Sequence, residues 1–531
     1  MTTAEPVQPV PTMLAGSGMV CAVDHMAAQA GLSMLGSGGS AADAAVAASA
    51  VMAVTTQHMC GMGGDLLAVA AAPGAVPVAL ESAGFAGAGA DPERLRAEGH
   101  KVMPFRDDVR SVTVPGCVDG WIALHTRLGK LPMATVLSPA RHYASAGFPA
   151  SPGLVASVPP IAHLAGADDF APPGGLHPGA TVRRPGIARA LAAVVADGRD
   201  GFYGGEFGEG LLALGAGYLV SGDMEVPIAR WRPAISAPAW GHRVWTVPPV
   251  SQGYLALAGA WIADGLDLPE CPDDPRWAHL LIEAAVQSGW DRSDVLHEGA
   301  DGDALVDPAR LAPRRAQISP DAASFRGGTH RPGGTIALCA VDEDRMGVCV
   351  LQSNAAGFGA HLAVPGVGIF LNNRGIGFSL DIGHPAEYGP GRRPPHTLSP
   401  LALTAPDGGL AAVTGTMGGD SQPQILLQLL ARVLHAGEDP GVAVAAPRWI
   451  LAPPRNRTGF DTWREQGPGR VLVEGHAPLA WDSGLRLRGH TVERTAAFSS
   501  DFGHAHYIAA RDDHLVGASD PRARSGAAVG Y

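Results

Sequence analysis

Thr335 stands at the start of a segment that could turn a threonine into a nucleophile. It follows the glycine pair Gly333 and Gly334 and opens an apolar, β-branched run over 335–342, which is typical of a buried strand. Cleavage after Gly334 would give Thr335 a free α-amine beside its own hydroxyl. Because an α-amine titrates near neutral pH, it can take the proton of that hydroxyl. One cut would therefore create a nucleophile and its base in the same residue.

A second threonine, Thr329, also follows a pair of glycines. Pro332 comes soon after it, so no strand can hold its backbone, whereas the run after Thr335 can form one. We therefore place the processing site at the bond between Gly334 and Thr335. On these residues alone, the glycine pair could also be a plain turn before a hairpin strand.

Two further glycines, Gly418 and Gly419, precede a predicted helix at 424–435. The unpaired N–H groups at a helix start can face a bound anion, and a residue without Cβ lets a substrate come close. Such donors can stabilise a tetrahedral oxyanion by ~3 to 4 kcal/mol. A turn that only leads into the helix is the alternative interpretation.

The elements that must position these residues differ between the two parts of the chain. Helices dominate the first part, at 26–35, 40–54, 117–128, 132–146, 186–197, 253–264 and 277–287, with strands at 66–72 and 76–81. Strands dominate the second part, at 335–342, 347–352, 368–371, 401–404, 410–414, 470–474, 491–494 and 506–510, with helices at 424–435 and 478–488. The segment 301–331 between them has little periodicity and predicts an exposed, mobile connection. Two strand-rich layers with helices outside favour an α/β (α+β) fold, a four-layer αββα sandwich.

Composition narrows the class of protein. Of the 531 residues, 46% are hydrophobic and only 17% are charged, which indicates a globular chain with a large core. The net charge of -12, without a long basic run, argues against nucleic acid as a partner. We find no apolar run that would span a membrane and no secretory leader. The six cysteines form no CxxC pair and are expected to be reduced, which predicts a cytoplasmic protein.

A series of short motifs resembles the gamma-glutamyltranspeptidase family, with every motif in the family's order along nearly the whole chain. The motifs lie at 36–46, 61–64, 114–116, 248–253, 335–342, 371–373, 393–400, 415–419 and 517–522. The resemblance implies an N-terminal nucleophile hydrolase, a zymogen that cleaves itself autocatalytically before Thr335. It would leave a large part, 1–334, whose last residues from about 301 form the mobile connection, and a small part, 335–531. These would stay together as a heterodimer, with a dimer of such pairs as a further option.

The same resemblance assigns roles to single residues. Thr335 would be the nucleophile that forms an acyl-enzyme, and Gly418 and Gly419 would hold the oxyanion. Ser353 occupies the place of a second threonine that hydrogen-bonds the nucleophile, and a serine hydroxyl can do the same. A plain serine at the end of a strand is the alternative for Ser353.

The substrate-recognition positions depart from the family pattern. Ala83 stands where an arginine holds the substrate carboxylate, and Arg374 stands where the family has residues leading to an amine-binding aspartate. A guanidinium there would repel an α-ammonium and favour a carboxylate or oxalyl group. An ion pair with a carboxylate such as Asp381 is the alternative role of Arg374.

Three more residues are assigned to substrate binding, namely Asn354, His396 and Thr397. His396 and Thr397 replace the paired serines of the family, although a loop histidine is often only structural. The stretch 378–392 is too short for a lid over the site, which admits other acyl groups. This pattern resembles the amidohydrolase and acylase members.

The sequence thus predicts a self-processing amidohydrolase that acts on a small amide with a non-glutamyl, oxamate-like acyl group. A true gamma-glutamyltransferase or glutathione hydrolase is the first alternative, and a non-catalytic scaffold or binding protein of this fold is the second. No cofactor is expected, because the glycines at 36–39 follow no clear strand and so make a poor dinucleotide loop. No metal is expected either, since His504 and His506 lack a third ligand.

Overall fold

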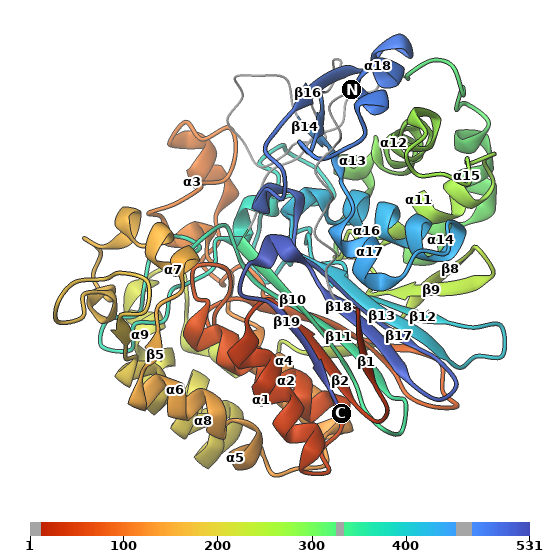
Figure 1. The fold of residues 1–531 in the computed structure, drawn as a ribbon. Coiled ribbons are helices and arrows are strands. Elements are labelled where there is room, and N and C mark those ends of the chain that lie inside the picture. The colour runs from red at the N-terminus through yellow and green to blue at the C-terminus, as the bar shows by residue number, and fades with distance from the viewer. Residues whose placement is uncertain (1–11, 325–333, 453–469) are drawn as a thin grey trace.

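The computed structural model describes residues 12–324, 334–452 and 470–531 (Figure 1). The rival processing residue Thr329 lies outside these ranges. Two seven-stranded sheets, antiparallel throughout, form the centre of the described structure. Helices cover the outer face of each sheet, so the fold is the predicted αββα sandwich.

The first sheet has the order β1-β18-β17-β13-β12-β9-β8. Its strands are β1 (Met13–Ala15), β18 (Leu515–Ser519), β17 (Ala505–Ala510), β13 (Leu410–Thr416), β12 (Leu401–Thr404), β9 (His242–Thr246) and β8 (Ile235–Ala239). The second sheet has the order β19-β2-β10-β11-β3-β4-β7. Its strands are β19 (Ala527–Gly530), β2 (Met19–Ala22), β10 (Gly334–Val341), β11 (Gly347–Ala355), β3 (Asp65–Ala71), β4 (Val78–Ser82) and β7 (Arg230–Pro233).

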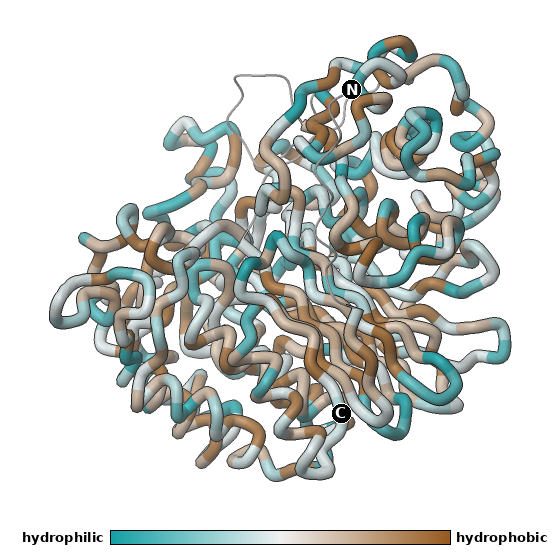
Figure 2. The backbone as a smooth tube through the Cα atoms, viewed as in Figure 1, coloured by the Kyte–Doolittle hydropathy of each residue, from teal (hydrophilic) through white to brown (hydrophobic). Residues whose placement is uncertain are grey.

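Both parts of the chain contribute to both sheets. In the second sheet, β10 and β11 from the second part lie between β2 and β3 from the first part. Cys339 on β10 is opposite Cys21 on one side and Cys349 on the other, and all three face the first sheet across a dry core. Figure 2 shows hydrophobic segments along the central strands, and on the helices around them. The two parts therefore share the core between the sheets, and each sheet contains strands from both parts.

The helices form two outer layers. Against the second sheet pack α1 (His25–Gly36), α2 (Ala41–Thr55) and α4 (Cys117–Leu128), while α6 (Ser138–Ala146) packs on α2, and α8 (Pro185–Tyr203) packs on α4 and α6. Against the first sheet pack α11 (Tyr254–Asp264), α16 (Gln422–Leu430) and α17 (Pro440–Ala445), while α12 (Pro275–Gly289) packs on α11 and α16, with α18 (Leu479–Leu487) outside α12. Shorter helices complete the layers, namely α3 (Pro92–Ala97), α5 (Met133–Val136), α7 (Pro152–Ser157), α9 (Glu206–Leu214), α10 (Ser221–Glu225) and α13 (Arg292–Val295). Small sheets join β5 (Phe148–Pro149) to β6 (Thr181–Val182), and β14 (Trp449–Ala452) to β15 (Arg470–Val473) and β16 (Thr491–Arg494).

Two predicted segments have a different kind of structure from the one expected. The strand predicted at 368–371 is wrong, because Phe370 and Leu371 form only isolated bridges. Gly366 and Gly368 have φ angles of +77° and +72°, which interrupt the extended backbone before the bridges. The segment after residue 301 begins with two helices, α14 (Gly302–Val306) and α15 (Pro308–Arg315). Each helix begins after an N-capping aspartate, Asp301 or Asp307. A judgement from composition and periodicity does not take such capping residues into account.

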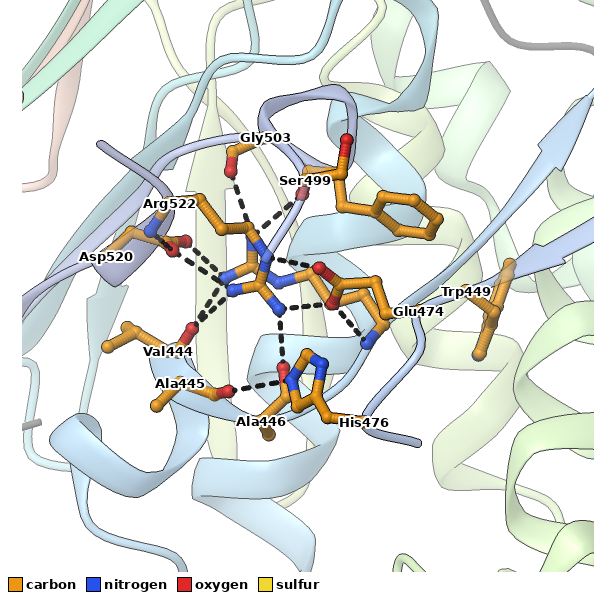
Figure 3. A network of polar contacts seen from close by, with 12 residues as sticks. Val444, Ala445, Ala446, Trp449, Glu474, His476, Ser499, Gly503, Asp520 and Arg522 are labelled. Carbon is orange, nitrogen blue, oxygen red and sulfur yellow. Dashed lines mark hydrogen bonds and ion pairs between the residues drawn. The ribbon is translucent and has the colours of Figure 1, made fainter. Parts of the chain in front are cut away.

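The motif at 517–522 forms a buried charge network (Figure 3). Arg522 is fully buried and bonds Glu474, Asp520 and the carbonyl oxygens of Val444 and Ala446. Burial acts to raise the pKa of Asp520, but Arg448 and Arg522 hold that pKa well below its usual range. Because every charge has a partner, the network can tie α17 to the end of β18 without leaving a buried ion unpaired.

The helices of the described ranges are also short or polar by the standard of membrane spans. Not one of them has both the length and the apolar character needed to cross a bilayer.

Candidate active site

A bulge in the central sheet brings two residues of β11 opposite Thr335. On β10, Gly334 pairs with Ala355 and Ile336 pairs with Gln352, so Ser353 and Asn354 together face the one residue between them. The Thr335 side chain is 1% exposed, and its Oγ1 donates to Ser353 Oγ over 3.1 Å. The structure therefore joins the predicted nucleophile to the hydroxyl predicted to orient it.

The Ser353 hydroxyl also contacts the carbonyl of the predicted processing bond. Its Oγ donates to Gly334 O over 2.6 Å and accepts from Arg374 Nη2 over 3.1 Å. The backbone N–H of Ala355 holds the same oxygen at 2.9 Å. A serine proton directed at a carbonyl oxygen polarises that carbonyl, and a cation behind the serine strengthens the effect.

Arg374 is buried behind Ser353, in the short 3-10 turn Arg374–Gly377. Its Nη1 donates to Thr397 Oγ1 over 3.2 Å, and its Nε lies 4.0 Å from Asp65 Oδ2. Burial lowers the pKa of Arg374 to about 10, with Asp65 acting in the opposite direction, so the guanidinium stays charged at neutral pH. The carboxylate found beside it is Asp65, whereas Asp381 was the example expected from the sequence.

His396 holds Asp65 in place. The His396 Nε2 contacts Asp65 Oδ2 at 3.1 Å, and its Nδ1 accepts from the backbone N–H of Leu398 at 3.3 Å. Burial, with Arg374 nearby, lowers the pKa of His396 to about 4, so the ring is neutral and Nε2 carries the proton. Both ring nitrogens are used within the protein, which favours the structural role left open for this residue.

Asn354 has the opposite character, a buried amide with free hydrogen-bonding atoms. It is 0% exposed, and neither its Oδ1 nor its Nδ2 has a hydrogen-bond partner among the described residues. A Cβ added to Gly64 would come within 2.5 Å of Asn354 Oδ1, which explains why the 61–64 motif is glycine there. An unsatisfied amide beside Thr335 is suited to bind a polar substrate group.

Gly418 and Gly419 form the turn between β13 and the helix α16. Their φ angles are +139° and +56°, a backbone that glycine adopts readily. Gly418 O accepts from Ser421 Oγ at 2.8 Å, and Gly419 O accepts from Gln252 Nε2 at 3.0 Å. Because N–H and C=O point in opposite directions across a trans peptide, the first bond directs the Gly419 N–H away from Ser421.

Two residues of this arrangement were missed as functional residues by sequence reasoning. Asp65 opens β3 and gathers Arg374 and His396, while the Gln252 amide bonds the carbonyls of both Thr397 and Gly419. Gln252 belongs to the 248–253 motif, so its place in the motif series was the available signal. Asp65 directly follows the 61–64 motif and had no signal of its own.

The sequence model of the gamma-glutamyltranspeptidase family matches residues 27–530. The chain belongs to this family. It is 34% identical to the oxamate amidohydrolase proenzyme of Klebsiella pneumoniae subsp. pneumoniae, over 97% of this chain and 98% of that protein. It is 32% identical to the glutathione hydrolase-like YwrD proenzyme of Bacillus subtilis, over 96% of this chain and 98% of that protein.

A solved family structure has the same fold over the whole chain. The crystal structure of cephalosporin acylase from Bacillus halodurans superposes with a TM-score of 0.88 at 30% identity, covering 100% of this chain and 99% of the acylase. This gamma-glutamyltranspeptidase family member is therefore an enzyme with the N-terminal nucleophile hydrolase fold, as the motif series predicted.

Proposed function

We propose that this family member is a proenzyme that cuts itself before Thr335 and then hydrolyses a short acidic amide. The observation that carries the proposal is the position of the Ser353 hydroxyl. It bonds both the Thr335 hydroxyl and the carbonyl oxygen of Gly334, the two groups that must react in self-cleavage.

In the processing step, Thr335 Oγ1 attacks the carbonyl carbon of Gly334. A bond forms between that oxygen and the carbon, the C–N bond to Thr335 breaks, and the hydroxyl proton ends on the leaving nitrogen. Ser353, supported by Arg374, donates to the oxygen that becomes negative. Water then hydrolyses the new ester and leaves Thr335 with a free α-amine.

In turnover, the α-amine takes the proton of Oγ1 while Oγ1 attacks the substrate amide. The N–H groups at Gly418 and Gly419 receive the negative charge of the tetrahedral intermediate, and the amine returns the proton to the leaving nitrogen. Water is the second acceptor and releases the acid. Ser353 keeps the Thr335 hydroxyl directed at the substrate.

The acyl group is proposed to be short and to carry a carboxylate next to the reacting carbonyl. A single hydroxyl, that of Ser353, separates the Arg374 guanidinium from the carbonyl of residue 334. Oxamate has its carboxylate directly beside its amide carbonyl, and the relative that is 34% identical is an oxamate amidohydrolase. At the position of the missing family arginine, Ala83 offers only its carbonyl, which the internally paired Arg393 uses.

The two products of processing would remain one particle, because each sheet contains strands from both parts. A reducing compartment suits the cysteines, all six of which are free, with five of them buried. We therefore keep the heterodimer and the cytoplasm as parts of the proposal.

The substrate is tested by comparing oxamate, glutaryl amides and a gamma-glutamyl anilide with the same processed protein. We expect kcat/KM for oxamate to exceed that for the anilide by roughly a hundredfold, since each missing charged hydrogen bond is worth about 1.5–3 kcal/mol. Faster release from the anilide would instead make the protein a glutathione-type hydrolase or transferase.

The nucleophile is tested with Thr335→Ala and Thr335→Ser. The alanine variant has no hydroxyl and is expected to stay whole and inactive, whereas the serine variant keeps some of both activities. A denaturing gel with mass spectrometry reads the products, 1–334 and 335–531. Cleavage of the alanine variant at the same bond would refute the mechanism.

A further inference from the structure

Three metal-binding side chains meet outside the catalytic region, on the outer helical layer. His279 and Glu283 are four residues apart on α12, so they share one face of that helix. His490 reaches them from the turn between α18 and β16. One nitrogen or oxygen atom from each of the three lies within 4.8 Å of the other two.

The hydrogen bonds of His279 fix which of its nitrogens carries the lone pair that a metal ion would use. His279 Nε2 lies 2.8 Å from Ser319 O, and because a carbonyl oxygen only accepts, Nε2 carries the proton. The lone pair is then on Nδ1, which accepts a hydrogen bond from His490 Nε2 at 2.8 Å, so a metal ion at this place would replace the His490 Nε2 proton. A histidine whose second nitrogen donates to a carbonyl is the usual outer arrangement of a metal ligand.

Glu283 supplies an unsatisfied oxygen to the same cluster. The side chain is 1% exposed, and its Oε2 accepts from the backbone N–H of Ser324 at 3.0 Å. Its Oε1 has no hydrogen-bond partner among the described residues and lies 3.9 Å from His490 Nε2. A buried carboxylate oxygen without a partner costs free energy that a bound cation would recover.

We propose that His279, Glu283 and His490 bind one divalent transition-metal ion, with Zn²⁺ as the preferred ion. Two imidazoles and a carboxylate are a common zinc ligand set, with water in the fourth position. Tetrahedral ligands at 2.0–2.2 Å from zinc lie roughly 3.4 Å apart. The contacts of 2.8 and 3.9 Å to His490 Nε2 lie on either side of that spacing, and the third pair of ligand atoms lies within 4.8 Å, so small side-chain movements would bring the three to zinc distances.

The three ligands come from both sides of the proposed processing bond, which gives the site a structural role. His279, Glu283 and the bonded segment 319–324 precede the processing bond proposed above, whereas His490 follows it. A metal here would join the two fragments after cleavage, a consequence that rests on the proposed function. Metal binding itself does not, because all three ligands are present in the uncut chain.

The test is titration of the chelator-stripped protein with zinc chloride or cobalt chloride alone, followed by calorimetry. We expect one ion per chain and, with cobalt, the visible absorption of a tetrahedral ion. His490→Ala and Glu283→Gln should each weaken binding at least about tenfold, as even outer-shell changes at zinc sites do. His514→Ala, which removes an exposed histidine, is the matched control and should leave the affinity unchanged.

Three outcomes distinguish the proposal from its alternatives. Absence of stoichiometric binding, or equal affinity in the wild type and a folded ligand variant, would overturn the site. Glu283→Gln keeps the shape of the side chain and an acceptor for Ser324 N–H, so it tests the site even if His490→Ala fails to fold. The uncleaved Thr335→Ala chain should bind the same single ion, which separates failure of the metal site from failure of processing.

Discussion

The Ser353 hydroxyl occupies a position that a simple strand-end serine would not need. It contacts Thr335 Oγ1, Gly334 O and Arg374 Nη2 at once, so its loss removes the donor to the processing carbonyl and the orienting partner of the nucleophile. We expect Ser353→Ala to slow self-cleavage by ~10²- to 10³-fold, the effect of losing one oxyanion donor. Timed denaturing gels of freshly made protein measure this rate.

Two comparisons separate this effect from general destabilisation. Ser353→Thr keeps the hydroxyl and should retain most of the cleavage rate. Ser288→Ala removes another buried serine that donates to a backbone carbonyl, in α12, and should leave cleavage unchanged. Cleavage of Ser353→Ala at the normal rate would mean that Gly334 O needs no donor from that residue.

Arg374 has two possible contributions, and kinetics distinguish them. If it binds a substrate carboxylate, Arg374→Lys lowers kcat/KM for oxamate more than for a neutral amide, because lysine cannot form the two parallel bonds of a guanidinium. If it only supports Ser353, both substrates lose the same factor. We expect the ratio of the two kcat/KM values to fall by about tenfold, one charged hydrogen bond. An unchanged ratio would remove Arg374 from substrate recognition.

Chemistry and motif order agree on Thr335, Gly418 and Gly419, whose catalytic roles stay predictions. The residues that hold the site together could not be predicted, because their contacts join distant parts of the chain. His396 contacts Asp65 across 331 residues, and Gln252 contacts Gly419 across 167. No periodicity or spacing in the sequence relates such pairs. Asp65 needs the cation and the histidine because its carboxylate is buried, and only the fold shows that burial.

At the scale of elements, the turn from β13 to α16 should be sensitive to a single methyl group. Gly418 has φ +139°, and a Cβ there would meet Ser421 Oγ at 2.8 Å and Ile425 Cδ1 at 3.0 Å. Gly418→Ala must therefore displace the Ser421 hydroxyl, which bonds Gly418 O, or shift the peptide that presents the Gly419 N–H. We expect turnover to fall by ~10²-fold, measured as kcat on the cleaved protein.

A glycine elsewhere provides the matched control for that variant. Gly408 also has a positive φ, +87°, but a Cβ there would meet nothing within 4 Å. Gly408→Ala should cost about 1 kcal/mol of stability through backbone strain and leave kcat unchanged. If the two variants lose activity equally, strain rather than displacement of the turn explains the loss.

Elements were predicted well where local patterns determine them. The helix predicted at 117–128 is α4 with the same bounds, since its apolar face repeats regularly and the Pro115–Gly116 turn precedes it. The predicted strand at 368–371 failed because its apolar residues pack as isolated bridges between glycine turns. Apolar character marks a buried segment, but the neighbours across the core decide whether it joins a sheet.

At the scale of the whole molecule, the burial of neutral histidines predicts acid sensitivity. Burial lowers the pKa of His58, His396 and His504 to about 4 and that of His506 to about 3. Unfolding returns each to an ordinary value of about 6.5, so the unfolded chain binds more protons below that pH. Stability from these groups is present above pH 6.5 and declines as pH falls toward 4.

We therefore expect the free energy of unfolding to fall between pH 6.5 and 5, above the range where most carboxyls titrate, by up to about 1.4 kcal/mol per pH unit for each histidine. Burial raises the pKa of Glu283 to about 7, so this group binds a proton more readily in the folded chain. It therefore reduces the expected fall in the free energy of unfolding, by the effect of at most one proton. Denaturant unfolding at several pH values gives the slope, and His506→Asn should reduce it by about one proton. A free energy of unfolding that stays constant over this range would mean that these rings take up protons in the folded protein near their ordinary pKa, so burial would not keep His396 neutral below pH 6.5.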